Sequence, residues 1–366
     1  MPSTQPSILA PRLQPPITGC DVAKRRSIRF AWVVVGLCVS LAALLLLSLQ
    51  FGAVPLQLHQ VHSGLTGGGN ALHDALIWNL RLPRSLLAAV VGLHFAVSGL
   101  ILQAVIRNPL ADPGVIGISS GASLAAVVLL LLADLINTGL QDAARHVSMT
   151  WLPFAALSGG LATAGLVLGL AWDARLSPAR LALNGVAVGA LLHAIVMWVV
   201  VIWGGARTEI ALIWLAGSLY GRDFNHLLVL LPWSVLGLAG TLMLLRPLSL
   251  LRFDDGIGQA LGLSVRRWRL VAIAVAVMLA ASAISVAGPI GFVGLVVPHL
   301  ARLLVGGDML RLLVTGAFSG AILTLAADTV ARTAISPLEL PVGALTTLIG
   351  IPVFLVILQH QARPRP

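Results

Sequence analysis

Residues 270–305 read LVAIAVAVMLAASAISVAGPIGFVGLVVPHLARLLV, and this run contains no charged residue before Arg302. A helix that crosses a bilayer needs about 20 mostly apolar residues. The run is long enough for nearly two such helices, and Gly288 and Pro289 divide it into expected spans at 270–287 and 290–305. This stretch therefore predicts a chain that crosses a membrane more than once.

The composition of the whole chain agrees with that prediction. The 366 residues are 58% hydrophobic and 10% charged, and the mean hydropathy is +0.97, whereas a soluble domain carries roughly 25% charged residues. In hydrocarbon every backbone polar group needs an internal partner, which leaves helices or closed barrels. Barrel strands alternate apolar and polar residues, but the apolar runs here are continuous. We expect an all-α polytopic membrane protein.

Three segments follow from the pattern of polar and apolar residues. Residues 1–27 are rich in Pro, Ser and Gln and predict a disordered cytoplasmic tail. Residues 28–360 form the expected transmembrane domain, and 361–366 a second cytoplasmic tail. The expected spans are 30–50, 84–106, 115–133, 151–171, 181–203, 227–245, 270–287, 290–305, 311–331 and 341–358.

The basic residues give the orientation of these ten spans. With the N-terminus inside, most of the 23 Lys and Arg residues fall on the cytoplasmic side, as the positive-inside rule requires. Both termini are therefore expected in the cytoplasm. The net charge of +10 is explained by these loops, because the chain has neither a basic helix face nor an aromatic platform for nucleic acid.

Several functions are disfavoured by missing residue types. An ion-driven carrier usually holds a carboxylate at mid-span, and the centres of these spans carry no Asp or Glu. The single lysine, Lys24, lies in the tail, so the chain has no phosphate-binding loop of its own. Neither a catalytic nucleophile nor a metal-ligand pattern is evident. Energy for active transport would have to come from another subunit.

The longest cytoplasmic connection, 246–269, is too polar to cross the membrane. It is either a solvated loop or a pair of short helices pressed against a cytoplasmic partner. Asp254 or Asp255 could cap a short helix, and Gly262 could end it. On the opposite side, Asp328 precedes Arg332 by four residues near the end of a span, which predicts a structural ion pair.

Several motifs, in order and spacing, resemble the permease subunit of bacterial ABC importers for ferric siderophores, haem and cobalamin. The runs that carry the resemblance are Arg81-Leu-Pro-Arg84, Arg107-Asn-Pro-Leu-Ala-Asp-Pro-Gly114, Gly288-Pro-Ile-Gly-Phe-Val-Gly-Leu-Val-Val-Pro-His299 and Glu339-Leu-Pro-Val-Gly343. The resemblance implies the type II importer fold with ten helices in the bacterial inner membrane. It also implies a second permease chain, identical or related, with two ATPase subunits below and a periplasmic substrate-binding protein above.

The resemblance further implies roles for individual residues. Docking to carboxylates of the binding protein would fall to Arg81, Arg84 and Arg332. Coupling to the ATPase would fall to Asp254, Asp255, Gly258, Ala260, Leu261 and Gly262. The cytoplasmic gate would include Ser177 and Pro178, where a small hydroxyl residue is expected in place of the proline. No cofactor is expected on this chain, since ATP and Mg²⁺ would bind the ATPase.

The stretch from Trp214 to Gly221 looks more like siderophore permeases than cobalamin permeases. The expected substrate is therefore a ferric siderophore, with haem or cobalamin as alternatives. An ion-driven secondary transporter is the rival from a different class.

Overall fold

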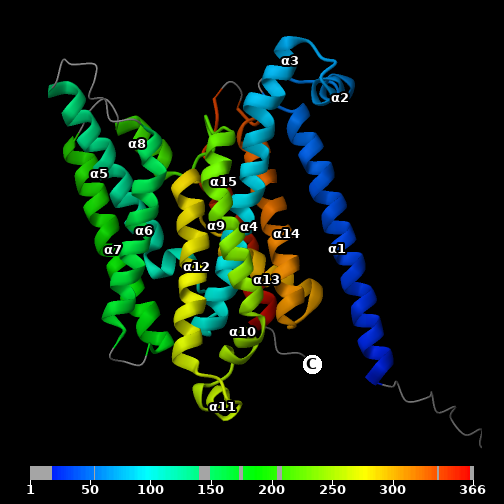
Figure 1. The fold of residues 1–366 in the computed structure, drawn as a ribbon, viewed down its shortest axis with the longest axis vertical. Helices are drawn as coiled ribbons and strands as arrows, with labels where there is room; N and C mark the ends of the chain where they lie inside the picture. The colour runs from blue at the N-terminus through cyan, green and yellow to red at the C-terminus, as the bar shows by residue number, and fades with distance from the viewer. Residues whose placement is uncertain are drawn as a thin grey trace, which may run out of the picture.

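The structure is a computed structural model that describes residues 19–52, 54–139, 149–172, 176–203, 208–335 and 338–362. Figure 1 shows a bundle of long, roughly parallel helices with short helices at both ends. The long helices are α1 (Gly19–Gln50), α4 (Leu82–Ile106), α5 (Ile118–Gly139), α6 (Leu152–Leu170), α7 (Pro178–Trp203), α9 (Phe224–Met243), α12 (Val265–Ala287), α14 (Met309–Ala331) and α15 (Val342–Ala362). The shorter α13 covers Val293–Val305.

These ten helices occupy the ten ranges expected from the sequence. Within the described ranges, eight helical stretches are long and apolar enough to cross a membrane, while α13 and the stretch Val342–Val356 of α15 are shorter. The start of α1 and the end of α15 lie at the end of the bundle that carries α11 (Asp255–Ala260). This is the arrangement expected for two cytoplasmic termini.

The first two predicted boundaries are corrected by the structure. Helix α1 begins at Gly19, so residues 19–27 are helical and only 1–18 of the expected tail lie outside the described residues. The second span is longer than 84–106, because one continuous helical stretch runs from Ala71 to Ile106. It passes through α3 (Ala71–Ala75) and a π-helical segment, η1 (Leu76–Arg81), before α4.

The eighth expected span, 290–305, is only partly helical. Gly288 and Phe292 have φ angles of 72° and 68°, so the chain leaves the helical conformation between α12 and α13. Helix α13 has 13 residues, which gives a length of roughly 20 Å, less than the ~30 Å of hydrocarbon. The Ala287 carbonyl accepts a hydrogen bond from Ser218 N at 2.8 Å. Protein contacts of this kind allow irregular backbone at membrane depth.

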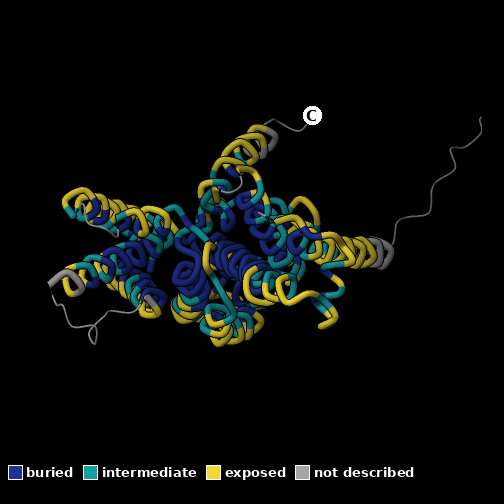
Figure 2. The backbone as a smooth tube through the Cα atoms, turned by 90° about the horizontal axis from the view of Figure 1, so that it is seen from above, coloured by how far each residue is buried: buried dark blue, intermediate teal, exposed yellow. Residues whose placement is uncertain are grey.

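Helices α4 and α12 form the centre of the bundle, and α1 stands at its edge. Figure 2 shows the buried backbone concentrated in the middle and exposed faces around the rim. Two glycines of α4 permit this packing. Gly92 lies against the carbonyl of Gly320 in α14, and Gly99 lies against Gly294 in α13, so a Cβ at either glycine would overlap the neighbouring backbone.

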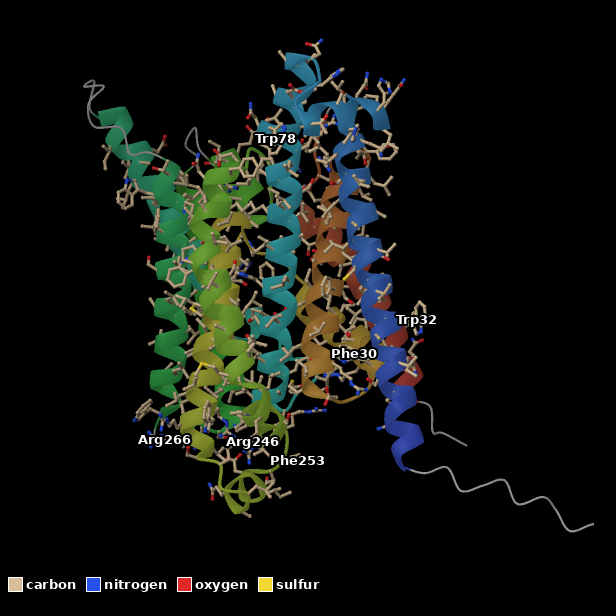
Figure 3. All side chains as sticks on the ribbon, turned by 45° about the vertical axis from the view of Figure 1, so that its right-hand side comes forward. Phe30, Trp32, Trp78, Arg246, Phe253 and Arg266 are labelled. Atoms are coloured by element: carbon tan, nitrogen blue, oxygen red, sulfur yellow. The ribbon has the colours of Figure 1, made fainter. Side chains whose placement is uncertain are left out.

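The remaining described helices are short. They are α2 (Leu58–Thr66), η2 (Pro113–Ile116), η4 (Met149–Trp151), α8 (Thr208–Leu215) and α10 (Leu245–Leu251). Helices α2 and α3 lie at one end of the bundle and α11 at the other (Figure 1). Figure 3 places Arg246, Phe253 and Arg266 at the α11 end and Trp78 at the opposite end. The basic end is cytoplasmic by the positive-inside rule.

Candidate functional site

The cytoplasmic connection 246–269 is a pair of short helices, α10 and α11, rather than a solvated loop. Asp254 caps α11, since its carboxylate accepts a hydrogen bond from Gly256 N at 3.0 Å. Gly262 has a φ of 79°, a left-handed conformation that glycine adopts without strain. It ends the helical turn before α12 begins at Val265. Asp254 therefore caps the short helix and Gly262 ends it, as the sequence predicts.

Asp255 is the centre of an internal charge cluster. Its carboxylate accepts hydrogen bonds from Arg269 Nη2 at 2.6 Å and from Arg269 Nη1 at 3.2 Å, and it forms a further ion pair with Arg107. Arg107 also donates from Nε to the Leu251 carbonyl at 2.9 Å. We call Arg107, Asp255 and Arg269 the Asp255 cluster. It joins the end of α4, the end of α10, the start of α11 and the first turns of α12.

The electrostatics favour an ionised Asp255. Partial burial by itself raises the pKa of this carboxyl group. Hydrogen bonds from Arg269 and Arg107, together with their positive charges, outweigh burial and hold the pKa below its ordinary value. Asp255 is therefore ionised at neutral pH.

Arg269 also reaches the expected gate. Its side chain is completely buried, and Nη1 donates to the Leu176 carbonyl at 3.1 Å. Leu176 is buried too, and its φ of 54° turns the chain immediately before α7. Ser177 follows and its carbonyl accepts a hydrogen bond from Leu181 N at 3.0 Å, while Pro178 is the first residue of α7. Proline suits this position because its missing N–H would have no helical partner.

The sequence predicts a coupling role for Asp255 but not the pairing of its carboxylate with Arg107 and Arg269. Arg269 is not among the residues predicted to couple the permease to the ATPase. Its position on the buried face of α12 follows a helical spacing, because Val265, Arg269 and Ala272 are four and three residues apart and all three are buried. Arg266 and Arg267 on the same helix are exposed.

The surface of the α11 region presents apolar side chains to solvent. Phe253, Ile257 and Leu261 are each at least half exposed. Ile257 lies in α11, Phe253 comes before the Asp254 cap and Leu261 follows the last helical residue, and we call these three the apolar row. Of the other expected coupling residues, Ala260 and Gly262 are exposed and Gly258 is buried. A Cβ at Gly258 would lie 3.1 Å from Val265, so this glycine seats α11 on α12.

At the opposite end, two of the three expected docking arginines stabilise the C-terminus of α1. Arg81 donates to the Leu49 carbonyl at 2.6 Å and to the Gln50 carbonyl at 3.0 Å. Arg332 donates to the Ser48 carbonyl at 2.6 Å. The last carbonyls of a helix have no partner within it and carry partial negative charge. The guanidinium groups of Arg81 and Arg332 donate hydrogen bonds to these carbonyls and place positive charge beside them.

Arg84 is bound inside the protein by carboxylates. Its Nη2 lies 2.8 Å from Asp328 Oδ1, its Nε lies 2.9 Å from the same atom, and its Nη1 lies 2.7 Å from Glu339 Oε2. Asp328 is completely buried. The expected contact of Asp328 with Arg332 is present at 3.8 Å, but Arg84 is the closer partner. These five residues form the outer arginine cluster, namely Arg81, Arg84, Asp328, Arg332 and Glu339.

The sequence predicts that Arg81, Arg84 and Arg332 dock the binding protein, and the structure places all three in the outer arginine cluster. Arg81, Arg84 and Arg332 are only 5–7% exposed. Each has hydrogen-bond acceptors within its own chain. The physical reason is that a guanidinium near the membrane boundary gains more from buried acceptors than from partial hydration. In this conformation the cluster fastens α1, α4 and α14 together.

Comparison with known proteins places these sites in context. The FecCD transport family matches residues 40–360. The chain is 38% identical over 339 residues to the Fe(3+)-citrate import system permease protein YfmE of Bacillus subtilis (strain 168), covering 93% of this chain and 98% of that protein. It is also 38% identical over 336 residues to the hemin transport system permease protein HmuU of Yersinia pestis, covering 90% and 96%.

A solved structure supports the same grouping. It is described as an inward-facing conformation of a metal-chelate type ABC transporter, and it is similar to this chain with a TM-score of 0.79 and 30% sequence identity. The alignment covers 90% of this chain and 99% of that one. The fold of this chain is therefore similar to that of a metal-chelate type ABC transporter over nearly its whole length.

Proposed function

The chain belongs to the FecCD transport family, and we propose that it carries a ferric siderophore or a related ferric chelate across the membrane as the permease subunit of an ABC importer. It is a multi-pass protein of the bacterial inner membrane and a transporter subunit rather than an enzyme. A relative named for ferric citrate import, 38% identical over 93% of this chain, supports a ferric chelate. The hemin relative keeps haem as the alternative substrate.

In this proposal two ATPase subunits supply the energy and hold the ATP and Mg²⁺. A second permease chain completes the pathway, and a periplasmic binding protein delivers the substrate. The apolar row of Phe253, Ile257 and Leu261 is the proposed seat for the ATPase. Exposed apolar side chains in a water-facing segment favour a protein partner, because burying them removes apolar surface from water.

The observation that carries the mechanism is the double contact of Arg269. One guanidinium holds Asp255 in α11 and the Leu176 carbonyl in front of α7. We infer that a shift of α11, driven by closure of the ATPases, moves the gate turn at Leu176–Pro178 through this side chain. The two states of the gate would then differ in their contacts with Arg269. Coupling between the ATPase and the gate requires such a difference between the states.

Docking of the binding protein is proposed at the outer end, above the outer arginine cluster. Direct pairing of Arg81, Arg84 or Arg332 with carboxylates of that protein would require exchange of the internal partners described above. Arg332 Nε is buried, makes no hydrogen bond in the described part of the chain and lies 3.8 Å from Asp328 Oδ2. Glu339, whose side chain is 29% exposed, would be the internal partner nearest to the surface.

Uptake in a strain without this chain tests the proposal. Labelled ferric citrate, a ferric hydroxamate, haem and cobalamin are offered separately, with and without the restored gene. We expect loss of one ferric chelate and its recovery on complementation. Loss of haem or cobalamin uptake instead would support an importer whose substrate is haem or cobalamin. Uptake that follows a proton or sodium gradient without ATP would reject the importer altogether.

A further inference from the structure

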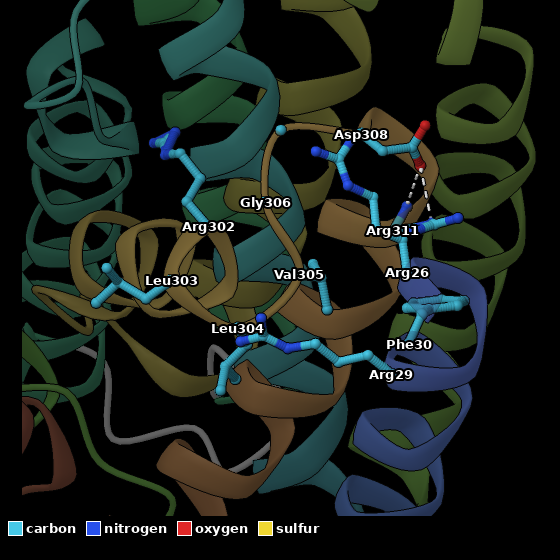
Figure 4. A pocket seen from close by; sticks show the side chains of 11 residues that line it. Arg26, Arg29, Phe30, Arg302, Leu303, Leu304, Val305, Gly306, Asp308 and Arg311 are labelled. Carbon is cyan, nitrogen blue, oxygen red and sulfur yellow. Dashed lines mark hydrogen bonds and ion pairs between the residues drawn. The ribbon is translucent and has the colours of Figure 1, made fainter. Parts of the chain in front are cut away.

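A basic pocket lies at the cytoplasmic end of the bundle, and none of its lining residues belongs to either site described above. Helix α1 contributes Arg26, Arg29 and Phe30, and α13 contributes Arg302 together with Leu304 and Val305. The loop that follows α13 and the start of α14 complete the lining with Asp308 and Arg311. The cavity has a volume of about 340 Å³, and Figure 4 shows the arginine side chains arranged around it.

Positive charge in this pocket exceeds the negative charge that faces it. The lining holds four arginines and one carboxylate, Asp308. That carboxylate already caps α14 by accepting from Arg311 N at 3.0 Å, and it lies 4.0 Å from Arg311 Nε. Arg302 donates to the neutral amide of Gln103. Arg252 adds a further cation beside the pocket, where it donates to the Gly307 carbonyl at 2.7 Å.

The pocket lies at the depth of lipid headgroups. Its outer wall is α1, the helix at the edge of the bundle (Figure 1). Figure 3 shows Phe30 and Trp32 on the cytoplasmic half of this helix, and Trp32 is 72% exposed. Tryptophan concentrates at the boundary between headgroups and hydrocarbon. Arg26 and Arg29 lie one to two turns closer to the cytoplasm, where their heads can reach phosphates while their stems stay in apolar surroundings.

We propose that this pocket binds the phosphate of an anionic phospholipid from the cytoplasmic leaflet. Guanidinium groups bind phosphate oxygens with pairs of charge-assisted hydrogen bonds, and basic pockets between membrane helices are suited to lipid headgroups. A lipid fits better than free phosphate because Phe30, Leu304 and Val305 offer apolar contacts beside the cations. An acyl chain attached to the bound headgroup would run along the lipid-facing side of α1.

Such a lipid would fasten the cytoplasmic half of α1. At its outer end this helix is already held by Arg81 and Arg332 through its last carbonyls. At its cytoplasmic end the described contacts with the basic pocket include Arg311 over the Phe30 ring, at 5.5 Å from the ring centroid. A phosphate shared by Arg29 and Arg311 would join α1 to α14 at this end as well.

Lipid retention by the purified importer tests the proposal. The intact complex is exchanged into detergent, supplied with dioleoyl-phosphatidylglycerol or dioleoyl-phosphatidylcholine, and examined by native mass spectrometry. We expect selective retention of the anionic lipid, reduced at least tenfold by Arg26→Ala with Arg29→Ala. The matched control is Arg246→Ala with Arg267→Ala, two exposed arginines at the same end outside the pocket. It should retain the anionic lipid as the unmodified importer does.

Three outcomes would overturn the proposal. Equal retention of the two lipids would show that charge plays no part. Equal loss in both double variants would show a diffuse effect of surface charge. Displacement of the lipid by inorganic phosphate at millimolar concentration, or binding of phosphate without lipid, would assign the pocket to a soluble anion. None of these results bears on whether the chain imports a ferric chelate, because substrate uptake is measured separately.

Discussion

Arg269 Nη1 lies 3.1 Å from the carbonyl oxygen of Leu176, although 93 positions separate the two residues in the chain. The same guanidinium binds the carboxylate of Asp255. One buried side chain thus spans the distance between the helix that faces the cytoplasm and the turn that begins α7. A rigid planar cation with five donors is suited to holding both partners at once.

Arg269→Gln should uncouple transport from ATP hydrolysis. The amide can reach one of the two partners but cannot pair with the Asp255 carboxylate as a charge. We expect substrate uptake by reconstituted importer to fall at least tenfold while its ATP hydrolysis continues. Arg267→Gln, an exposed position on the same helix, serves as the control and should leave the ratio of uptake to hydrolysis unchanged. An unchanged ratio in Arg269→Gln would remove Arg269 from the mechanism.

Leu261→Glu should weaken association with the ATPase. A charge introduced into the apolar row would be buried against the partner without a counter-ion, which is costly. The measurement is recovery of the ATPase with the affinity-purified permease, and we expect a loss of at least fivefold. Gln259→Glu places the same charge on an exposed neighbouring position of α11 as a control. Equal recovery with both variants would place the ATPase elsewhere.

The Asp255 cluster should persist over a wide pH range. The folded-state pKa of Asp255 is depressed, so its stabilising contribution is fully present above the unfolded-state value, ~3.9. It is lost only as pH falls through the lower, folded value. Hydrogen exchange of the α11 amides, corrected for intrinsic rates, should show equal protection at pH 7 and pH 5. A marked loss of protection at pH 5 would contradict this electrostatic account.

Arg84→Gln should destabilise the permease itself. Removing one member of a buried ion pair costs about 3 kcal/mol, and the Asp328 carboxylate would keep only its longer contact with Arg332. Thermal unfolding in detergent should therefore occur at a clearly lower temperature. Adding Asp328→Asn should recover part of the loss, since it removes the buried carboxylate that has lost its closer partner. If Arg84→Gln weakened docking of the binding protein without lowering thermal stability, the result would contradict a structural role and support a direct docking role for Arg84.

Gly99→Ala should disrupt the packing of α4 on α13. The added methyl group would overlap the Gly294 backbone, and overpacking of this kind costs on the order of 1–3 kcal/mol. Gly165→Ala in α6 is the matched control, because a methyl group added there would meet no atom of a neighbouring helix within 4 Å. The yield of monodisperse protein should fall for the first variant and not for the second.

The sequence is most informative where the signal is local. Continuous apolar runs locate ten helices, Asp254 and Gly262 mark the limits of α11, and a spacing of four residues places Asp328 near Arg332. The contacts that form the Asp255 cluster and the outer arginine cluster join residues that lie far apart in the chain. Nothing along the chain distinguishes Arg84 as the closer partner of Asp328, since that contact depends on how α4 and α14 pack.

The same limit applies to the three arginines predicted to dock the binding protein. The sequence places Arg81 near the end of a span but does not show that the end of α1 folds over this residue and offers it carbonyl groups. Burial of those side chains depends on a helix more than thirty residues earlier in the chain. Likewise, an apolar run predicts that a segment lies within the membrane, but it does not predict that the backbone there is helical. The non-helical stretch 288–292 before α13 therefore does not follow from the sequence.

The pairing of Arg84 with Asp328 has a consequence for how the protein is made. The two residues are 244 positions apart, and at roughly 5–20 residues per second a ribosome needs on the order of 12–50 s to synthesise the chain between them. Throughout that interval Arg84 has no carboxylate from α14. The newly made α4 must keep this side chain within reach of water or headgroups until α14 emerges. Its final depth in the membrane is therefore set late, by a helix synthesised near the end of the chain.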